Sequence, residues 1–414
     1  QQYTPSEGNL KARQEFADSK LGIFLHWGIY STFAQGEWYL HKSKLSHAEY
    51  KKAADAFYPH RFDAKAWVKA FKEAGAKYIC LTSRHHDGFS LYDTCGLNDY
   101  STAVFIGRDL VREFVDACNR HGIVPFFYHT YLDWYDERFD SDFPAYLDFL
   151  RKSVELLCKN YGKIGGIWFD GMWHKPNSDW QEDELYGTIR KYQPDAMIIN
   201  NTGLSARGAL GHIELDSVTF ERGRPQKINT EESPKYIASE MCQVMNSHWG
   251  YAENDLSYIS PADVIKDLTV CKKCGSNFLL NVGPLPNGYL RTIDSAILEI
   301  VGKWVSINRE IMDAVPCDIK IENKDDDFIL QTDTAYYILC NNLPMVADPN
   351  VALANGSADY EVRFKTDKRI KSIHWLDNGN ELKFTQEDSD VLVYTTPFSY
   401  GNHLVVRAAK AIFE

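Results

Sequence analysis

The chain has 414 residues, of which 44% are hydrophobic and 25% charged, so it is long enough for one large domain and a smaller one. Lys plus Arg total 45 and Asp plus Glu total 57, and the net charge of -12 argues against nucleic acid or an anionic membrane as a partner. A neutral small molecule fits better. No apolar stretch has the length that a membrane span needs. The chain begins Gln1-Gln2-Tyr3 without an initiator Met, so we expect that a leader was removed and that the protein is periplasmic or secreted.

The nine cysteines are irregularly spaced, which is not the pattern of a disulfide framework. Cys271 and Cys274 have the spacing of half a zinc site or of a redox motif. They lie in a helical stretch, however, and no second pair accompanies them. We therefore expect neither a metal nor any other cofactor.

Strand-like apolar runs alternate with helical patterns through the first two-thirds of the chain, which favours βα units and a parallel sheet. The expected strands cover residues 22–28, 78–88, 124–129, 164–170, 196–200 and, less regularly, 213–220. Helices are expected after Asp63, over 110–118, from Pro144 to Cys158 and over 184–192. Three consecutive strand–helix units predict either a doubly wound sheet or a closed barrel.

The end of the chain follows a different pattern. A helix over 262–274 precedes a final barrel strand over 277–284, and one long helix from Thr292 to about Met312 should close the domain. From Val315 onward, period-two runs at 328–331, 335–340, 360–364 and 391–394 predict antiparallel strands. We therefore expect a catalytic domain over residues 1–314 and a C-terminal β-sandwich over 315–414.

Several predicted strands end in groups that can do chemistry. Asp170 ends the run Ile164 to Phe169, and His26, His85 and Tyr128 occupy similar positions on other strands. In a barrel of parallel strands, the carboxyl ends open onto one common face, so these side chains would share a pocket. A strand-end Asp that only caps the next helix is the alternative for any one of them.

Seven segments in order resemble the α-L-fucosidases of glycoside hydrolase family 29, over about residues 5 to 314. They are 20–28 (KLGIFLHWG), 36–39 (GEWY), 82–89 (TSRHHDGF), 132–134 (LDW), 168–171 (WFDG), 247–251 (SHWGY) and 275–284 (GSNFLLNVGP). The resemblance implies a (β/α)8-like TIM barrel followed by a β-sandwich. It also implies hydrolysis with retention of configuration, in which one carboxylate acts as nucleophile and a second group as acid/base.

Asp170 matches the family's nucleophile. The acid/base is left open between two glutamates, with Glu214 a more distant candidate. Glu221 matches an Asp-x-x-Thr-x-Glu pattern, whereas Glu240 matches a Trp-Glu pattern in which Ser239 replaces the Trp. Thr202 stands where relatives often have an Arg, which leaves the substrate contacts on that side undetermined.

The resemblance also implies a set of sugar-binding residues. These are His26, Glu37, Trp38, His85 and His86. Independently of the resemblance, Trp38, Tyr128, Trp173 and Trp249 are candidate apolar walls for a sugar. A zinc site is the competing interpretation of the three histidines, because histidines on barrel strands can ligate metal.

We therefore expect an exo-acting α-L-fucosidase that releases terminal α-L-fucose from a fucosylated oligosaccharide or glycoconjugate without a cofactor. Two alternatives remain: a retaining glycosidase for a galactose-like sugar, and a sugar-binding protein on a decayed enzyme scaffold. The second becomes credible if neither Glu221 nor Glu240 reaches the pocket.

Overall fold

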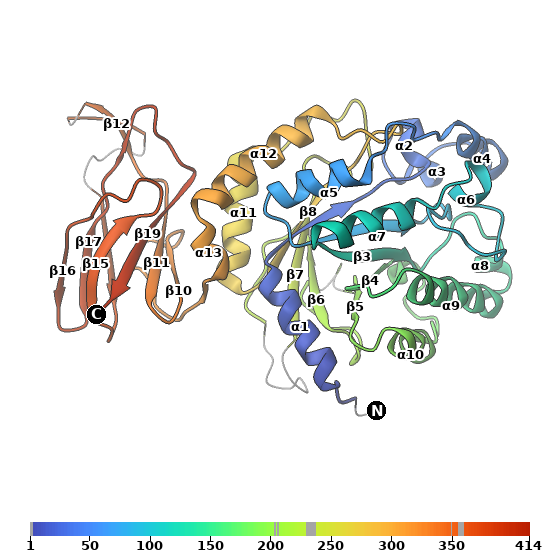
Figure 1. The fold of residues 1–414 in the computed structure, drawn as a ribbon, viewed down its shortest axis with the longest axis horizontal. Coiled ribbons are helices and arrows are strands. Elements are labelled where there is room, and N and C mark those ends of the chain that lie inside the picture. The colour runs from blue at the N-terminus through green and yellow to red at the C-terminus, as the bar shows by residue number, and fades with distance from the viewer. Residues whose placement is uncertain (1–2, 203, 205–206, 229–236, 349, 355–359) are drawn as a thin grey trace. The chain divides into compact units, whose positions relative to one another are not determined.

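The computed structural model describes the chain except for residues 1–2, 203, 205–206, 229–236, 349 and 355–359. Eight parallel strands form a closed barrel in chain order, and β1 pairs with both β2 and β8 (Figure 1). The strands are β1 (Leu21–Leu25), β2 (Tyr78–Arg84), β3 (Val124–Thr130), β4 (Gly166–Asp170), β5 (Met197–Asn200), β6 (Ser217–Glu221), β7 (Ala238–Gln243) and β8 (Asn277–Val282). The predicted (β/α)8-like barrel is confirmed, and the doubly wound alternative is wrong.

Two strands differ from the sequence-based expectation. β6 begins at Ser217 rather than near Ile213, and no strand was expected where β7 lies. A strand buried on both faces normally has a nearly continuous apolar sequence. β7 reads Ala-Ser-Glu-Met-Cys-Gln, so its polar residues hide it from a search for apolar runs.

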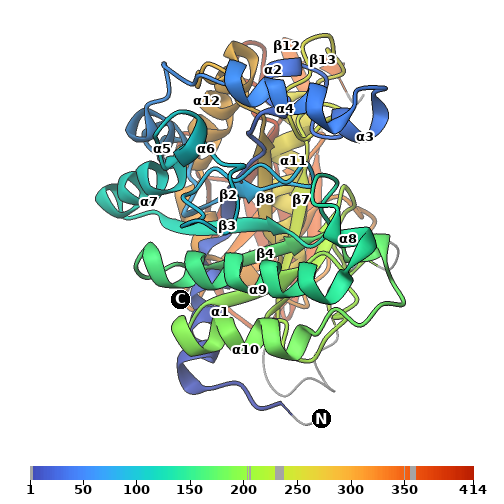
Figure 2. The same cartoon turned by 90° about the vertical axis from the view of Figure 1, so that its right-hand side faces the viewer.

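Helices cover the outside of the barrel strands (Figure 2). They include α5 (Ala64–Glu73), α7 (Leu110–His121), α9 (Phe143–Asn160) and α10 (Glu182–Tyr192). The first three begin at aspartates, Asp63, Asp109 and Asp142, whose side chains accept hydrogen bonds from backbone N–H groups of the first turn. Such caps satisfy donors that have no partner inside the helix.

The N-terminal helix α1 (Glu7–Ser19) lies at the end of the barrel where the strands begin. The ring of Phe16 lies 5.2 Å from that of Tyr78 and 5.7 Å from that of Phe126, between centroids. Arg13 Nε donates to Asp216 Oδ1 over 2.7 Å, and both side chains are fully buried. Because a broken buried ion pair is costly, this pair anchors α1 against the barrel.

The chain divides into two compact units, residues 1–259 with 276–300 and residues 260–275 with 301–414. The predicted boundary between residues 314 and 315 stays a prediction. The long helix expected from Thr292 to Met312 is two helices, α12 (Thr292–Ile307) and α13 (Arg309–Asp313). They are separated at Asn308, whose side-chain amide donates to the carbonyl oxygen of Trp304 over 3.0 Å. An amide that bonds the preceding turn competes with helix continuation.

The second unit contains α11 (Pro261–Cys274) and antiparallel sheets, which confirms the β-sandwich expected after the barrel. One sheet has the order β15-β19-β11-β10-β9 and another β14-β17-β16, and a third, β13-β12-β18, contains one parallel pair. Their bounds are β9 (Val315–Pro316), β10 (Phe328–Gln331), β11 (Ala335–Asn341), β12 (Met345–Asp348), β13 (Val351–Ala354), β14 (Glu361–Lys365), β15 (Ile370–Trp375), β16 (Phe384–Glu387), β17 (Asp390–Tyr394), β18 (Phe398–Ser399) and β19 (Val406–Phe413).

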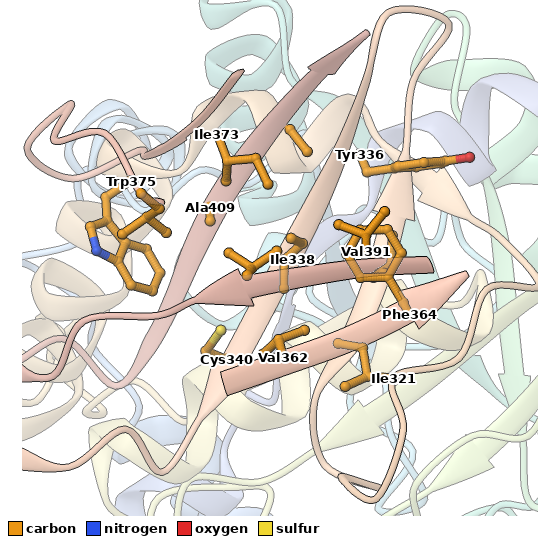
Figure 3. Packing of buried hydrophobic residues seen from close by; sticks show 14 of the residues in the cluster. Ile321, Tyr336, Ile338, Cys340, Val362, Phe364, Ile373, Trp375, Val391 and Ala409 are labelled. Atoms are coloured by element: carbon orange, nitrogen blue, oxygen red, sulfur yellow. The ribbon is translucent and has the colours of Figure 1, made fainter. Parts of the chain in front are cut away.

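Alternate residues of these strands point into a shared apolar core. Along β14, Val362 and Phe364 are buried while their neighbours are exposed, as a period of two requires. Figure 3 shows these side chains among Ile338, Trp375 and Val391 from other strands.

The cysteines show no covalent pairing. Cys271 and Cys274 lie on α11, and none of the nine cysteines, all within the described part of the chain, forms a disulfide. Over the described ranges, no helix has both the length and the apolar character to cross a membrane.

Candidate active site

A cavity of about 190 Å³ lies at the carboxyl ends of the barrel strands. Nine of the residues singled out in the sequence for catalysis or sugar binding line it: His26, Glu37, Trp38, His85, His86, Tyr128, Asp170, Glu221 and Trp249. Trp173, a candidate wall, lines it as well, together with Phe24, Trp168, Leu204 and Arg222. Glu240 and Thr202 do not. The common face expected from the strand ends therefore holds most of the predicted residues.

Asp170 is the last residue of β4, and its side chain retains 14% of its accessible surface. Gly171 follows at a φ of +99°, a backbone conformation that glycine adopts readily, and the chain turns away there. Tyr128 Oη donates to Asp170 Oδ2 over 2.9 Å, and Trp173 Nε1 donates to Oδ1 over 3.3 Å. His86 Nε2 lies 3.5 Å from Oδ2.

The electrostatic surroundings keep this carboxylate ionised. Burial alone would raise the pKa of Asp170, but hydrogen bonding and charge from His86, with the hydrogen bonds from Tyr128 and Trp173, outweigh it and lower the pKa below its usual value. A carboxylate that stays charged and keeps an open face can act as a nucleophile.

Glu221 ends β6 beside Asp170, and Asn201 connects the two. The amide nitrogen of Asn201 lies 3.3 Å from Asp170 Oδ1 and 3.4 Å from Glu221 Oε1. Thr219 donates to the amide oxygen of Asn201 over 3.0 Å, which fixes the orientation of the amide. Burial, and then the charge of Asp170, raise the pKa of Glu221 to about 7. The pocket thus holds one ionised carboxylate and one carboxyl group that can keep a proton near neutral pH.

Glu240 lies deeper in the barrel. Thr219 pairs with Glu240 across the sheet and Glu221 pairs with Cys242, so Glu240 is two residues closer to the start of the strands. At about 3.3 Å per residue, that places its backbone roughly 6–7 Å below the level of Glu221. Tyr78 Oη donates to Glu240 Oε2 over 2.5 Å and Trp168 Nε1 donates to Oε1 over 2.8 Å. Burial raises the pKa of Glu240 to about 7, against the effect of these two hydrogen bonds.

His26 and His85 are held in neutral forms that can bind hydroxyl groups. His26 Nδ1 lies 2.7 Å from Asn281 Oδ1, and Asn281 Nδ2 donates to the carbonyl oxygen of Trp249 over 2.7 Å. The amide orientation therefore requires a proton on His26 Nδ1 and leaves Nε2 as an acceptor. Burial lowers the pKa of His26 to about 3 and holds that of His85 well below its usual value.

The remaining predicted residues occupy the wall of the pocket. Glu37 is buried and accepts a hydrogen bond from the backbone nitrogen of Gly250 over 2.8 Å. The ring of Trp38 stacks on that of Trp173 at 5.7 Å with an angle of 12° between planes. Tyr128 stacks on His85 at 5.1 Å and 6°. Outside the masked residues, no group of three or more His, Cys, Asp or Glu side chains is placed to hold a metal ion.

Phe24, Leu204 and three residues with polar groups, Trp168, Asn201 and Arg222, were not predicted from the sequence. Trp168 precedes Asp170 by two residues on the same strand, so strand alternation alone would have placed it on the inner face. Asn201 directly follows β5, which is the same strand-end position that identified Asp170. Arg222 also directly follows a strand, but the direction of its side chain depends on the left-handed conformation in which the chain leaves β6. Thr202 bonds the carbonyl oxygen of Leu210 over 3.2 Å instead of lining the pocket.

Comparison with known proteins agrees with this geometry. The model of the family described as Alpha-L-fucosidase matches residues 1–310. The chain belongs to this family. Curated relatives include the tissue alpha-L-fucosidase of Rattus norvegicus, 29% identical over 95% of this chain and 88% of the relative. The alpha-L-fucosidase of Dictyostelium discoideum is also 29% identical, over 75% of this chain and 74% of the relative.

Solved structures of family members have the same fold. Alpha-L-fucosidase isoenzyme 1 from Paenibacillus thiaminolyticus matches with a TM-score of 0.81 and 27% identity, over 98% of this chain and 100% of that one. A GH29 alpha-L-fucosidase from Bacteroides thetaiotaomicron, solved as a trapped covalent intermediate, matches with a TM-score of 0.81 and 22% identity over 100% of this chain and 98% of that one. At that identity, the second match supports the fold alone. The chain is therefore a glycoside hydrolase of the α-L-fucosidase family.

Proposed function

We propose that the enzyme releases terminal α-L-fucose from fucosylated glycans by double displacement, with Asp170 as nucleophile and Glu221 as acid/base. One observation carries the proposal: a single amide, that of Asn201, contacts both carboxyl groups in the pocket. Because Asp170 Oδ1 and Glu221 Oε1 lie 3.3 and 3.4 Å from the same nitrogen, they are at most about 6.7 Å apart. This limit lies at the bottom of the roughly 6.5–9.5 Å range between the carboxyl groups of inverting enzymes, and it allows the roughly 5–5.5 Å of retaining enzymes.

In the first step, Asp170 attacks the anomeric carbon while Glu221 gives its proton to the departing glycosidic oxygen. The bond to the released sugar breaks and a fucosyl ester forms on Asp170. In the second step, Glu221, now ionised, removes a proton from water, and the resulting hydroxide displaces Asp170. Two inversions give net retention, and Glu221 recovers its proton.

The pKa directions fit these roles. The pKa of Asp170 is lowered, so it is charged when substrate arrives, whereas the pKa of Glu221 is raised to about 7 and allows it to carry a proton. Two titratable groups whose surroundings push their pKa values apart are typical of an acid–nucleophile pair. The Bacteroides enzyme was solved as a trapped covalent intermediate, which is the species that a double displacement forms.

Sugar binding is assigned to the surrounding groups. His26 Nε2 and the carboxylate of Glu37 can accept hydrogen bonds from hydroxyl groups, and the indoles of Trp38 and Trp249 offer apolar faces. The decayed-scaffold alternative loses its basis, since Glu221 reaches the pocket. An exo mode of action fits a cavity as small as about 190 Å³. Location outside the cytoplasm remains a prediction.

A substrate panel tests the proposal. 4-Nitrophenyl α-L-fucoside should be hydrolysed much faster than 4-nitrophenyl α-D-galactoside, which has a hydroxyl group on C6 and a sugar of the D instead of the L series. Proton NMR of the first product should show the α anomer before mutarotation. Faster cleavage of the galactoside would support the galactose-like alternative, and an initial β anomer would contradict double displacement.

A further inference from the structure

Arg222 occupies an unusual position at the end of β6. It directly follows Glu221, and its backbone φ of +49° lies in the left-handed region that few non-glycine residues adopt. The backbone nitrogen of Arg222 donates to the carbonyl oxygen of Cys242 over 2.9 Å, which ties this conformation to β7. The turn directs the side chain to the lining of the pocket, so a strained residue sits next to the proposed acid/base.

Two contacts hold the guanidinium group of Arg222 in place, but not all of its N–H donors are used. Its carbon lies 5.3 Å from the centre of the Trp249 ring, and Nη2 donates to the carbonyl oxygen of Ser247 over 3.2 Å. In the part of the chain that the structure describes, Nε and Nη1 have no hydrogen-bond partner, and the residue is exposed. A guanidinium held over an indole ring is pre-organised, so its free donors can bind an oxygen atom with little loss of freedom.

The proposed reaction indicates which group would lie near these free N–H donors. An acid catalyst must come within hydrogen-bond distance of the oxygen that it protonates, so the departing sugar must lie beside Glu221. Arg222 is the next residue along the chain and lines the same cavity. Among the described lysines and arginines, it alone lines the cavity, whose acidic side chains are Asp170, Glu37 and Glu221.

We propose that Arg222, supported by the face of Trp249, binds oxygen atoms of the sugar that is released and so determines leaving-group specificity. The inference rests on the proposed function, because it takes Glu221 as the acid/base. It assigns to the enzyme a preference for aglycones that are themselves hydroxylated sugars, over flat apolar leaving groups that offer Arg222 no acceptor.

The charge of Arg222 also affects the pKa of Glu221, which a pH–rate profile can measure. Four charged groups act on Glu221: Asp170 on β4 and Glu37 raise its pKa, whereas Arg222 and Arg207 lower it. Arg207 Nε donates to the backbone carbonyl oxygen of Glu221 over 2.8 Å. Removing the charge of Arg222 should therefore raise the pKa of Glu221 and move the basic limb of the pH–rate profile to higher pH.

The experiment compares Arg222→Met and Arg222→Lys with Arg224→Met, a matched control two residues away that does not line the cavity. Each variant is assayed on 2-chloro-4-nitrophenyl α-L-fucoside and on whichever of the α1,2-, α1,3-, α1,4- and α1,6-linked fucosyl disaccharides the wild type cleaves best. Arg222→Met should lower kcat/KM on the disaccharide roughly 10- to 100-fold, as expected for lost hydrogen bonds to a charged donor, and on the aryl fucoside less than about 3-fold. Arg222→Lys should fall between, and Arg224→Met should match the wild type.

Equal losses on both substrates, or an unchanged ratio with an unchanged basic limb, would overturn the inference. So would a wild-type enzyme that cleaves the aryl fucoside but none of the disaccharides. Should Arg222→Met fail to fold by circular dichroism, Arg222→Lys decides, because it keeps the charge and loses the planar donor pair. The proposed function fails separately, through a wild type inactive on the aryl fucoside.

Discussion

Glu221 and Glu240 lie at two depths of one barrel, and their pKa values are both raised to about 7. The causes differ. Glu221 is raised by burial and by the charge of Asp170, and it faces the pocket. Glu240 is raised by burial alone, and both its oxygens accept hydrogen bonds from barrel side chains, Tyr78 and Trp168. A raised pKa therefore does not identify an acid catalyst; contact with the nucleophile's pocket does.

The contrast also assigns Glu240 a different task. Trp168, which donates to Glu240, lines the cavity and lies between the two levels of the barrel. Tyr78, which donates to the other oxygen, packs against Phe16 of α1. Glu240 thus joins side chains of the barrel interior, and we expect its loss to affect stability more than chemistry.

The largest effect is expected at Asp170. Asp170→Ala should lower kcat by on the order of 10⁴-fold or more while circular dichroism shows an intact fold, because the covalent intermediate cannot form. Azide added to this variant should restore turnover and give the β-fucosyl azide, since it attacks from the face that Asp170 vacates. Near-normal turnover without azide would exclude Asp170 as nucleophile.

Glu221→Ala should separate substrates by leaving group. An acid catalyst contributes roughly 10²- to 10⁴-fold, and it matters most for a poor leaving group, so the loss should be large on fucosyl oligosaccharides. Formation of the intermediate from an activated aryl fucoside should be much less affected. The wild-type rate should fall as pH rises through the pKa of Glu221, about 7, and this basic limb should disappear in the variant. Equal loss on both substrates would argue for a binding role instead.

Glu240→Gln should change the free energy of unfolding and leave the pH dependence of the rate unchanged. The amide can still accept from Trp168 and can donate to Tyr78. A carboxyl group whose folded pKa is raised stabilises the protein most below its unfolded pKa, and that stabilisation is lost as pH rises through the folded value. The pKa of Glu240 is 4.5 in the unfolded chain and about 7 in the folded protein, so the free energy of unfolding of the wild type should fall by on the order of 3 kcal/mol between pH 4.5 and 7.

The variant should lack that loss and gain stability relative to the wild type at pH 8. Urea unfolding at pH 4.5 and 8 measures the difference. A pH dependence that is unchanged in Glu240→Gln would show that Glu240 does not titrate in this window.

The smallest effect is expected from metal removal. Prolonged EDTA treatment followed by gel filtration should leave kcat/KM unchanged, because hydrogen bonds and carboxylates account for each proposed step. Loss of activity that zinc restores would support the histidine-ligand alternative.

The sequence predicted which residues lie at strand ends better than it predicted how deep each side chain lies within the barrel. Asp170 could be placed because an apolar run stops on it, and barrel geometry then gives its direction. Glu221 and Glu240 could not be ranked, because their difference is a two-residue offset in register between β6 and β7. β7 itself was missed, since Ser239, Glu240 and Gln243 interrupt its apolar pattern.

The side chains that join the elements were harder to predict. Arg222 depends on a left-handed backbone conformation after β6, and nothing in the residue type favours one. Asn201 contacts two carboxylates from different strands, which requires the packed barrel. The break at Asn308 likewise comes from a side chain that bonds the preceding turn in a sequence otherwise compatible with one helix.

Azide rescue of the acid/base variants tests the central assignment most directly. In Glu221→Ala, an aryl fucoside should still form the fucosyl ester on Asp170, and azide, which needs no general base, should attack it from the face that the leaving group occupied. Proton NMR should show α-fucosyl azide from Glu221→Ala, whereas Glu240→Ala should give free fucose as the wild type does. Formation of α-fucosyl azide by Glu240→Ala and not by Glu221→Ala would contradict the assignment.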